Sequence, residues 1–228
     1  MRLTALASDY DGTLAHDGTV DEPTLRALEM FRKSGRKLVL VTGRELDDLR
    51  SVYSRFDLFD RIVAENGAVL LTPSTGEKRI LAERPKPEFV AALRQRGVRP
   101  ISCGDVIVAT RQPNETKVLK VIRDLGLELQ VIFNKGAVMV LPPGVNKVSG
   151  LKEALAELGL SERNVAGVGD AENDHAFLHF CGFSAAVANA LPSVKETANI
   201  TTKSSHGAGV VELMEMILHD QIASYTPA

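Results

Sequence analysis

The hydrophobic residues of this chain alternate between two patterns. Short, almost unbroken apolar runs predict buried strands at residues 3–7, 37–41, 164–169 and 185–188, with a last short strand at 200–202. Apolar residues that recur every three or four positions predict helices at about residues 22–34, 46–53, 147–158, 176–180, 194–198 and 210–222. Residues 61–71 read as two strands joined by a turn at Asn66-Gly67. Strands that alternate with helices predict an α/β fold with a doubly wound, mostly parallel sheet.

The pattern changes from about Glu83 onwards. Helices are expected near residues 89–97 and 118–126, and hairpins at residues 101–110 and 129–141. The first hairpin turns at Cys103-Gly104-Asp105, and the second turns at Asn134-Lys135-Gly136. This order lacks the strand–helix alternation of a parallel sheet. We therefore expect residues 1–82 and 142–228 to form a core domain, with residues 83–141 inserted as a small α+β domain.

Composition narrows the class of protein. The 228 residues include 27 basic and 29 acidic residues, for a formal net charge of -2, which gives no sign of a nucleic-acid or anionic-membrane partner. No apolar run approaches the roughly 18 residues of a membrane span. The first residues enter a strand without the apolar region of a signal peptide. Cys103 and Cys181 lie far apart, so we expect reduced thiols and a cytoplasmic location.

Polar residues follow three of the predicted strands. Asp9 and Asp11 come after the first strand, Thr42 follows the second, and Asp170 and Asp174 follow the strand at 164–169. The carboxyl ends of neighbouring parallel strands share one crevice, which is where ligands bind in such sheets. Two acids placed two residues apart repel each other, and a divalent cation removes that repulsion. The sequence therefore predicts a Mg²⁺ site at this edge of the sheet.

The same residues supply the parts that phosphoryl transfer requires. One carboxylate can attack phosphorus and form an acyl phosphate. A second carboxylic acid can protonate the leaving oxygen and later activate water. A hydroxyl, backbone N–H groups and a lysine can hold the phosphate oxygens, and Lys147 at the start of a predicted helix is the candidate lysine.

Four motifs resemble those of a known family. They are Asp9-Tyr10-Asp11-Gly12-Thr13, Thr42-Gly43-Arg44, Lys147, and Gly169-Asp170-Ala171-Glu172-Asn173-Asp174. In this order they resemble the haloacid dehalogenase-like phosphatases, and the inserted segment resembles the cap of the Cof-type branch. The resemblance covers nearly the whole chain. Val148 stands where glycine is common in the family, which leaves Lys152 as the substitute for Lys147.

The resemblance implies a role for each residue of the motifs. Asp9 would be the nucleophile and Asp11 the general acid and base. Mg²⁺ would be held by Asp9, the backbone carbonyl of Asp11 and Asp170, with Asp174 supporting the metal from beside it. The phosphate would be bound by Thr42, Gly43, Lys147 and Asn173.

Asp11 favours phosphate esters as substrates, because an ester oxygen needs a proton when it leaves, whereas dehalogenases of this superfamily lack the second acid. The resemblance implies a small soluble monoester of the phosphoglycolate or sugar-phosphate type. Candidates to contact the rest of the substrate are Arg44, Arg111, Asn134 and Lys135. Thr42 also suits a helix cap, and Arg44 also suits a pair with an acid on its own helix.

Other functions use similar residues. A phosphomutase would use the same Asp pair and return the phosphoryl group to its substrate. A phosphoacceptor signalling domain or a non-catalytic binding module would use the fold without turnover. His175 and His179 have a spacing that suits zinc, but no third ligand is evident, so we expect a packed or exposed pair. His206 is expected in a loop, and Asn66 either braces the join to the inserted segment or only makes its turn.

Overall fold

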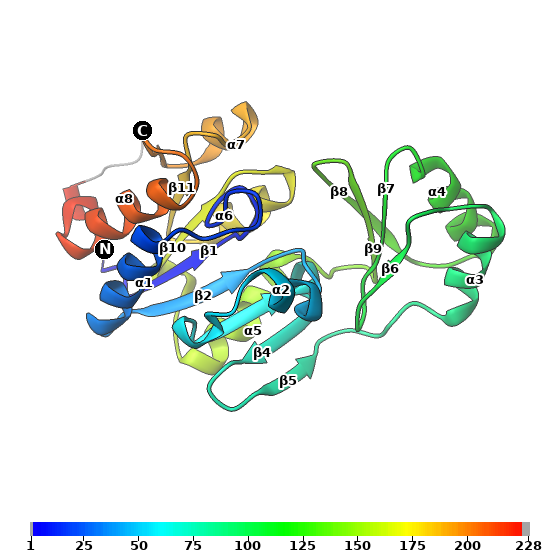
Figure 1. The fold of residues 1–228 in the computed structure, drawn as a ribbon, viewed down its shortest axis with the longest axis horizontal. Helices are drawn as coiled ribbons and strands as arrows, with labels where there is room; N and C mark the ends of the chain where they lie inside the picture. Colours follow the sequence, from blue (N-terminus) through cyan, green and yellow to red (C-terminus); the bar gives the residue numbers. More distant parts are fainter. Residues whose placement is uncertain (1, 225–228) are drawn as a thin grey trace.

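The structure is a computed structural model that describes residues 2–224, and it contains two β-sheets (Figure 1). The larger sheet has the strand order β12-β11-β10-β1-β2-β3-β4-β5. Its strands are β1 (Ala5–Ser8), β2 (Lys37–Val41), β3 (Arg61–Ala64), β4 (Val69–Thr72), β5 (Glu77–Ile80), β10 (Val165–Gly169), β11 (Phe183–Ala186) and β12 (Ile200–Thr201). Neighbours from β12 to β3 are parallel, while β4 and β5 are antiparallel. The predicted doubly wound, mostly parallel sheet is confirmed.

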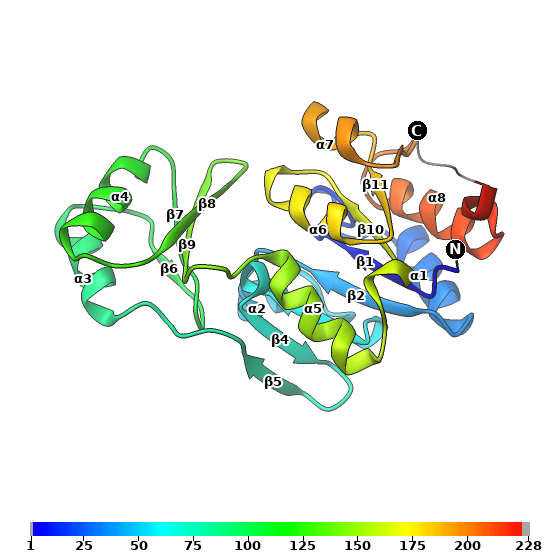
Figure 2. The ribbon, with the colours of Figure 1, turned by 180° about the vertical axis from the view of Figure 1, so that it is seen from behind.

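Helices cover both faces of this sheet. One face carries α1 (Glu22–Lys33), α2 (Leu46–Val52) and α8 (His206–Leu218), and the opposite face carries α5 (Lys147–Leu158) and α6 (His175–Phe180) (Figures 1 and 2). The short helix α7 (Pro192–Thr197) packs against β11 and α6. The central strands are buried on both faces, which explains their unbroken apolar sequences. Within residues 2–224 we find no helix whose length and apolar character would let it cross a bilayer.

The smaller sheet is antiparallel, with the strand order β6-β7-β9-β8. Its strands are β6 (Ser102–Cys103), β7 (Val108–Arg111), β8 (Gln130–Asn134) and β9 (Ala137–Leu141), and its helices are α3 (Pro87–Gln95) and α4 (Glu115–Asp124). The helices lie on the side of the sheet that faces away from the larger sheet (Figure 1). Val138 and Val140 of β9 pack in the cluster with these helices, whereas Met139 and Leu141 join the main core. The face of the smaller sheet opposite its helices therefore packs on the rest of the molecule.

Short 3-10 turns connect several of these elements. They are η1 (Phe56–Leu58), η2 (Glu65–Gly67), η3 (Glu162–Asn164), η4 (Glu172–Asp174) and η5 (Gln221–Ser224). Two of them bear on the site: η2 follows β3, and η4 follows β10. The expected Asn66-Gly67 turn is part of η2, in which Glu65 also has a positive φ of 50°.

Several predicted bounds shift by two or three residues, as in β11, which is Phe183–Ala186 rather than 185–188, and two elements differ more. Strand β5 was not predicted, because its residues Glu77-Lys78-Arg79-Ile80 are all exposed at the sheet edge and show no apolar alternation. The last helix is α8, which begins at His206 and ends at Leu218 rather than spanning 210–222. The sequence pattern did not indicate the first turn of α8, because this turn contains Gly207 and glycine is a poor helix former. A Cβ at Gly207 would collide with the Thr24 hydroxyl of α1, so this glycine allows the two helices to approach closely.

Candidate active site

Three adjacent strands place the predicted acids and threonine at one edge of the larger sheet. Strand β1 lies between β10 and β2, with Ser8 paired to Val168 on one side and Leu40 on the other. Asp9, Thr42 and Asp170 follow these strands and are all buried. Carboxylate oxygens of Asp9, Asp170 and Asp174 lie within 4.8 Å of one another. Residues separated by more than 160 positions in the chain thus form one cluster, which we call the carboxylate cluster (Asp9, Asp170, Asp174).

Lys147 reaches this cluster from the first turn of α5. Asn146 caps the helix, and its side chain accepts the backbone N–H groups of Val148 and Ser149. The Lys147 ammonium donates to Asp9 Oδ1 at 2.5 Å and to Asp174 Oδ1 at 2.6 Å, with only 1% of its side chain exposed. Lys152 is exposed, and its ammonium lies 5.3 Å from the ring centroid of Phe180. The structure therefore brings Lys147, and not Lys152, to the cluster.

The cluster carries more negative charge than Lys147 offsets. Burial, followed by the nearby Asp174, raises the pKa of Asp9 from 3.8 to about 7, although Lys147 acts in the opposite direction. Burial also raises the pKa of Asp170. Burial acts to lower the pKa of Lys147, but Asp174 and Asp9 outweigh it and raise that pKa above its ordinary value. A further cation at the cluster would favour the ionised acids.

The donor set fits a hard divalent cation. Asp174 Oδ2 accepts the backbone N–H groups of Asp170 at 2.8 Å and Ala171 at 2.9 Å, while its Oδ1 accepts Lys147. Both oxygens of Asp174 therefore accept donors of the chain itself. Asp170 Oδ1 accepts the Thr13 hydroxyl at 3.1 Å, and Asp170 Oδ2 lies at the space beside Gly12. Gly12 has a φ of +84°, and a Cβ there would lie 2.6 Å from Asp170 Oδ2. The glycine keeps this space open, and carboxylate and carbonyl oxygens are the ligands that Mg²⁺ prefers.

Lys135 occupies this space from the smaller sheet. It lies in the turn between β8 and β9, and its ammonium donates to Asp170 Oδ2 at 2.6 Å and to the backbone carbonyl of Asp11 at 2.8 Å. These are two of the oxygens that the family resemblance assigns to Mg²⁺. The sequence placed Lys135 near the substrate but gave no sign of these partners.

Asp11 and Arg44 form a bidentate pair. Arg44 Nε donates to Asp11 Oδ2 at 2.7 Å, and Nη2 donates to Oδ1 at 2.8 Å. The third guanidinium nitrogen donates to Asp48 Oδ2 at 2.7 Å, one turn further along the chain. Arg44 therefore fixes the direction of the Asp11 carboxylate. The expected pair with an acid of α2 is present, and Arg44 also lines a cavity, while its contact with a substrate stays a prediction.

The predicted phosphate-binding residues lie beside the cluster. Thr42 Oγ1 accepts the backbone N–H of Arg44 at 3.1 Å. Gly43 lies under the smaller sheet, where a Cβ would approach Met139 Sδ to 3.4 Å. Asn173 Nδ2 donates to Asn66 Oδ1 at 3.1 Å, while within residues 2–224 its buried Oδ1 has no partner. The side chain of Asn66 in η2 thus positions the side chain of Asn173 in η4.

A cavity of about 480 Å³ opens above these residues, and it is lined from both sheets. The larger sheet contributes Asp9, Asp11, Gly43 and Arg44, while the smaller sheet contributes Arg111, Asn134, Lys135 and Met139. Arg111 is exposed, and Asn134 Oδ1 is buried without a partner among the described residues. The structure therefore brings the predicted specificity residues to the same cavity as the predicted catalytic ones.

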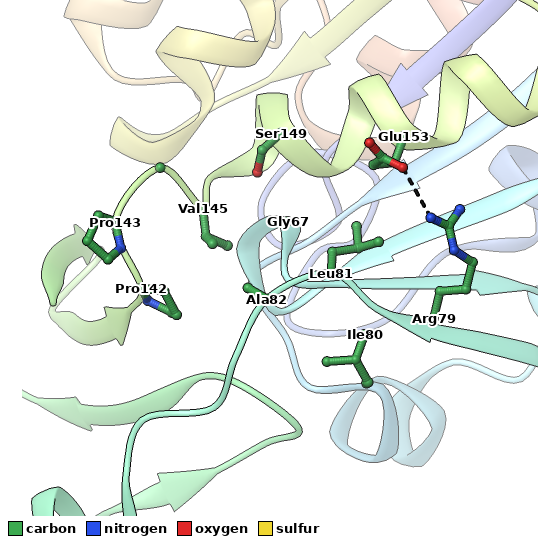
Figure 3. Close-up of a pocket in the computed structure, with 11 residues that line it drawn as sticks. Gly67, Arg79, Ile80, Leu81, Ala82, Pro142, Pro143, Val145, Ser149 and Glu153 are labelled. Atoms are coloured by element: carbon green, nitrogen blue, oxygen red, sulfur yellow. Dashed lines mark hydrogen bonds and ion pairs between the residues drawn. The ribbon is translucent and has the colours of Figure 1, made fainter. Parts of the chain in front are cut away.

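A second cavity of about 510 Å³ lies where the chain passes between the two sheets (Figure 3). Ala82 and Pro142 line it from the two connections, together with Val145 and Ser149 near the start of α5. Arg79 at its rim is paired with Glu153. None of the carboxylate cluster lines this cavity, so we do not assign the chemistry to it.

Sequence reasoning missed Glu65. Its buried carboxylate accepts three backbone N–H groups from the loop between β6 and β7, from Asp105 at 2.7 Å, Val106 at 2.7 Å and Ile107 at 2.8 Å. Glu65 therefore ties the smaller sheet to the end of β3. A glutamate beside an Asn-Gly turn reads as an ordinary surface residue, so no local signal indicated this contact.

Two of the histidines considered in the sequence, His175 and His206, contact neighbouring segments of the chain. His175 lies within hydrogen-bond reach of Ser193 and Thr197. His206 begins α8, and its Nδ1 lies 3.0 Å from the carbonyl of Gly12. Its ring stacks on His16, with the ring centroids 4.4 Å apart. His206 thus supports the loop that carries the first motif.

Known proteins resemble this chain over most of its length. The haloacid dehalogenase-like hydrolase family matches residues 6–98 and 104–214. A phosphoglycolate phosphatase of Methanothermobacter thermautotrophicus is 31% identical over 225 residues, which cover 95% of this chain and 99% of that protein. A crystal structure from Thermoplasma acidophilum has a TM-score of 0.83 at 15% identity and covers 96% of this chain and 99% of its own. A sugar phosphatase of haloacid dehalogenase subclass IIB has a TM-score of 0.74 at 20% identity, with 96% and 99% covered. The resemblance read from the four motifs is confirmed.

Proposed function

The chain belongs to the haloacid dehalogenase-like hydrolases and is a phosphatase of that family, and we propose that it hydrolyses small phosphate monoesters with Mg²⁺ through an aspartyl phosphate on Asp9. The observation that carries the proposal is the position of Asp9 at the end of β1, between Thr42 and Asp170, with the Lys147 ammonium on its carboxylate.

We also propose that residues 83–141 act as a cap over a core of residues 1–82 and 142–228. The cavity lined from both sheets supports this division.

The first half-reaction forms a bond between a carboxylate oxygen of Asp9 and phosphorus. The bond from phosphorus to the ester oxygen breaks, and its electron pair stays on that oxygen, which takes a proton from the Asp11 carboxyl. Lys147, the Thr42 hydroxyl and backbone N–H groups next to Gly43 hold the non-bridging oxygens. Bound Mg²⁺ would supply positive charge to the carboxylates and the phosphoryl oxygens.

The second half-reaction restores Asp9. The Asp11 carboxylate takes a proton from a water molecule, whose oxygen forms a bond with phosphorus. The bond from phosphorus to Asp9 breaks, and the electron pair returns to the Asp9 carboxylate as phosphate leaves. Arg44 contributes by fixing the direction of Asp11, so it is a positioning residue for both proton transfers.

We propose phosphoglycolate as the ester, on two grounds. Relatives with this name match the chain over nearly their whole length. The cavity also presents cationic side chains from the cap, Arg111 and Lys135, which suit a leaving group that carries its own carboxylate. The likeness to a solved sugar phosphatase concerns the fold alone. We further propose a cytoplasmic location, which the free thiols of Cys103 and Cys181 support.

Phosphate release tests the proposal. Phosphoglycolate, glucose 6-phosphate and p-nitrophenyl phosphate would be compared with Mg²⁺ and with EDTA, in the wild type, in Asp9→Asn and in the exposed control Asp47→Asn. We expect steady turnover that needs Mg²⁺, is fastest with phosphoglycolate and is lost only in Asp9→Asn. Acid-quenched protein should carry phosphate in the wild type and none in Asp9→Asn. Transfer of phosphate back to the substrate would indicate a mutase, and a single stoichiometric burst or no release would contradict the phosphatase.

A further inference from the structure

The ammonium of Lys135 stands where a metal cation is expected. It lies 2.6 Å from Asp170 Oδ2 and 2.8 Å from the carbonyl oxygen of Asp11. A Cβ at Gly12 would collide with this ammonium as well as with Asp170, so the space that the glycine leaves open is the space that Lys135 fills. An ammonium and a divalent cation compete for the same oxygens, and they cannot both occupy them.

The backbone conformation at Lys135 is unusual for a lysine, and it supports a functional role for the contact of its ammonium with Asp170. Asn134 pairs with Ala137, so Lys135 and Gly136 are the two central residues of a tight turn. Their φ angles are +46° and +81°. A lysine rarely adopts a positive φ, and asparagine or glycine is the ordinary choice in such a turn. A strained residue whose side chain reaches a cluster of acids indicates a functional constraint rather than a turn preference.

The two lysines at the cluster are not equivalent. Lys147 comes from the start of a core helix, and only 1% of its side chain is exposed. Lys135 comes from the tip of a hairpin in the other sheet, and 42% of its side chain is exposed. Lys147 is therefore a fixed cation of the site, whereas Lys135 can leave by a rotation of its side chain within the open cavity.

We propose that Lys135 is an internal cation that occupies the metal site of the metal-free protein and is displaced by Mg²⁺. The displaced ammonium then lies in the cavity that Arg111 also lines, where it binds the carboxylate of the leaving group. The substrate half of this inference rests on the proposed function. The metal half does not, because it concerns only the oxygens that Lys135 holds. Metal loading therefore has to precede recognition of an anionic leaving group.

Competition makes a defined prediction for metal binding. A site that is closed by Lys135 binds Mg²⁺ with an apparent affinity reduced by the fraction of time it is open. Lys135→Met removes the ammonium and should tighten Mg²⁺ binding by about tenfold, within the usual range of such couplings. Lys135→Gly also removes the ammonium and should tighten Mg²⁺ binding to the same extent. Because glycine relieves the strained backbone and methionine does not, equal effects in the two variants would assign the change to the charge. Lys120→Met removes an exposed lysine of α4 and should change nothing.

Isothermal titration of Mg²⁺ into the substrate-free protein, after treatment with EDTA, measures these affinities. If Lys135→Met and Lys135→Gly bind Mg²⁺ no more tightly than the wild type, the inference is overturned. Steady-state kinetics at saturating Mg²⁺ test the second half. Lys135→Met should raise KM for phosphoglycolate by roughly tenfold with little change in kcat. KM for p-nitrophenyl phosphate, which has no carboxylate, should stay the same.

The two assays separate this inference from the proposed function. Tighter Mg²⁺ binding without turnover of any phosphate ester would support the internal cation and contradict the phosphatase. Turnover of phosphoglycolate with unchanged Mg²⁺ binding in both variants would support the phosphatase and overturn the internal cation. An equal rise in KM for both esters would overturn the assignment of Lys135 to the leaving-group carboxylate.

Discussion

Replacement of Asp9, the proposed nucleophile, should stabilise the metal-free protein while it abolishes turnover. The Asp9 carboxylate is buried beside Asp174 and Asp170, and its pKa is raised from 3.8 to about 7. An acid with a raised pKa binds more protons in the folded than in the unfolded state, so the stability it contributes is lost as the pH rises from about 4 to 7. At pH 8 the ionised Asp9 therefore opposes folding, and Asp9→Asn removes that charge at nearly constant volume.

The size of the effect follows from the pKa. The change from 3.8 to about 7 corresponds to roughly 4 kcal/mol, at about 1.4 kcal/mol for each factor of ten. The buried amide, which lacks a full set of hydrogen-bond partners, costs about 2 kcal/mol. The net gain is then about 2 kcal/mol at pH 8, or roughly 4 to 8 °C in Tm for a chain of this length. At pH 5 the wild-type carboxyl is protonated when folded but largely ionised when unfolded, so the favourable part falls to roughly 2 kcal/mol, the cost offsets it, and the gain should be about zero.

Thermal unfolding in EDTA at pH 5 and pH 8 measures both values. Asp47→Asn, which removes an acid whose side chain is 97% exposed, is the control and should shift Tm by less than about 1 °C at either pH. With excess Mg²⁺ the order at pH 8 should reverse, because the wild type gains the binding energy of the metal. A lower Tm for Asp9→Asn than for the wild type in EDTA at pH 8 would refute the electrostatic reasoning.

Three further outcomes are expected. Asp11→Asn should slow turnover of phosphoglycolate much more than that of p-nitrophenyl phosphate, because only the poor leaving group needs a proton; an equal loss in kcat would contradict the acid role. Glu65→Gln should lower Tm by roughly 3 to 12 °C, since a carboxylate that accepts three N–H groups is worth about 1.5 to 3 kcal/mol, while the exposed control Glu77→Gln should not. A thiol reagent should label exposed Cys103 in the native protein and Cys181 only after unfolding, because burial raises the pKa of the Cys181 thiol; rapid labelling of both thiols would refute this.

Most of the fold was predictable because burial leaves a strong pattern. Strands β1, β2 and β10 are covered on both faces, so their sequences are unbroken apolar runs. Strand β5 lies exposed at an edge, where pairing through the backbone needs no apolar side chain, and it could not be found in this way. The start of α8 was hidden because Gly207, a poor helix former, serves the contact with α1.

The convergence of the acidic residues at one edge of the sheet was predictable for a different reason. Parallel strands deliver their carboxyl ends to one edge, so the acids after β1 and β10 had to meet once the sheet was parallel. The contacts of Arg44, Glu65 and Lys135 depend instead on where the smaller sheet and the connecting loops settle in space. That placement is set by apolar packing, with Met139 and Leu141 buried in the main core, and no local sequence pattern encodes it.

Two of the polar contacts between the smaller sheet and the rest of the molecule have the same polarity, because in each a buried carboxylate accepts from a donor of the smaller sheet or its loops. At one, the buried carboxylate of Glu65 accepts backbone N–H groups of the loop between β6 and β7, and the geometry of three short hydrogen bonds makes this contact rigid. At the other, the carboxylate of Asp170 accepts the ammonium of the half-exposed Lys135. A cation cannot compete for Glu65, whose oxygens are taken by N–H groups in a buried loop, but it can compete for Asp170. Burial and the neighbouring acids make Asp9 costly to ionise, and one of those acids, Asp170, also holds the β8–β9 hairpin through Lys135. Under the competition that we propose, a divalent ion that neutralises these acids would therefore weaken the contact with Lys135.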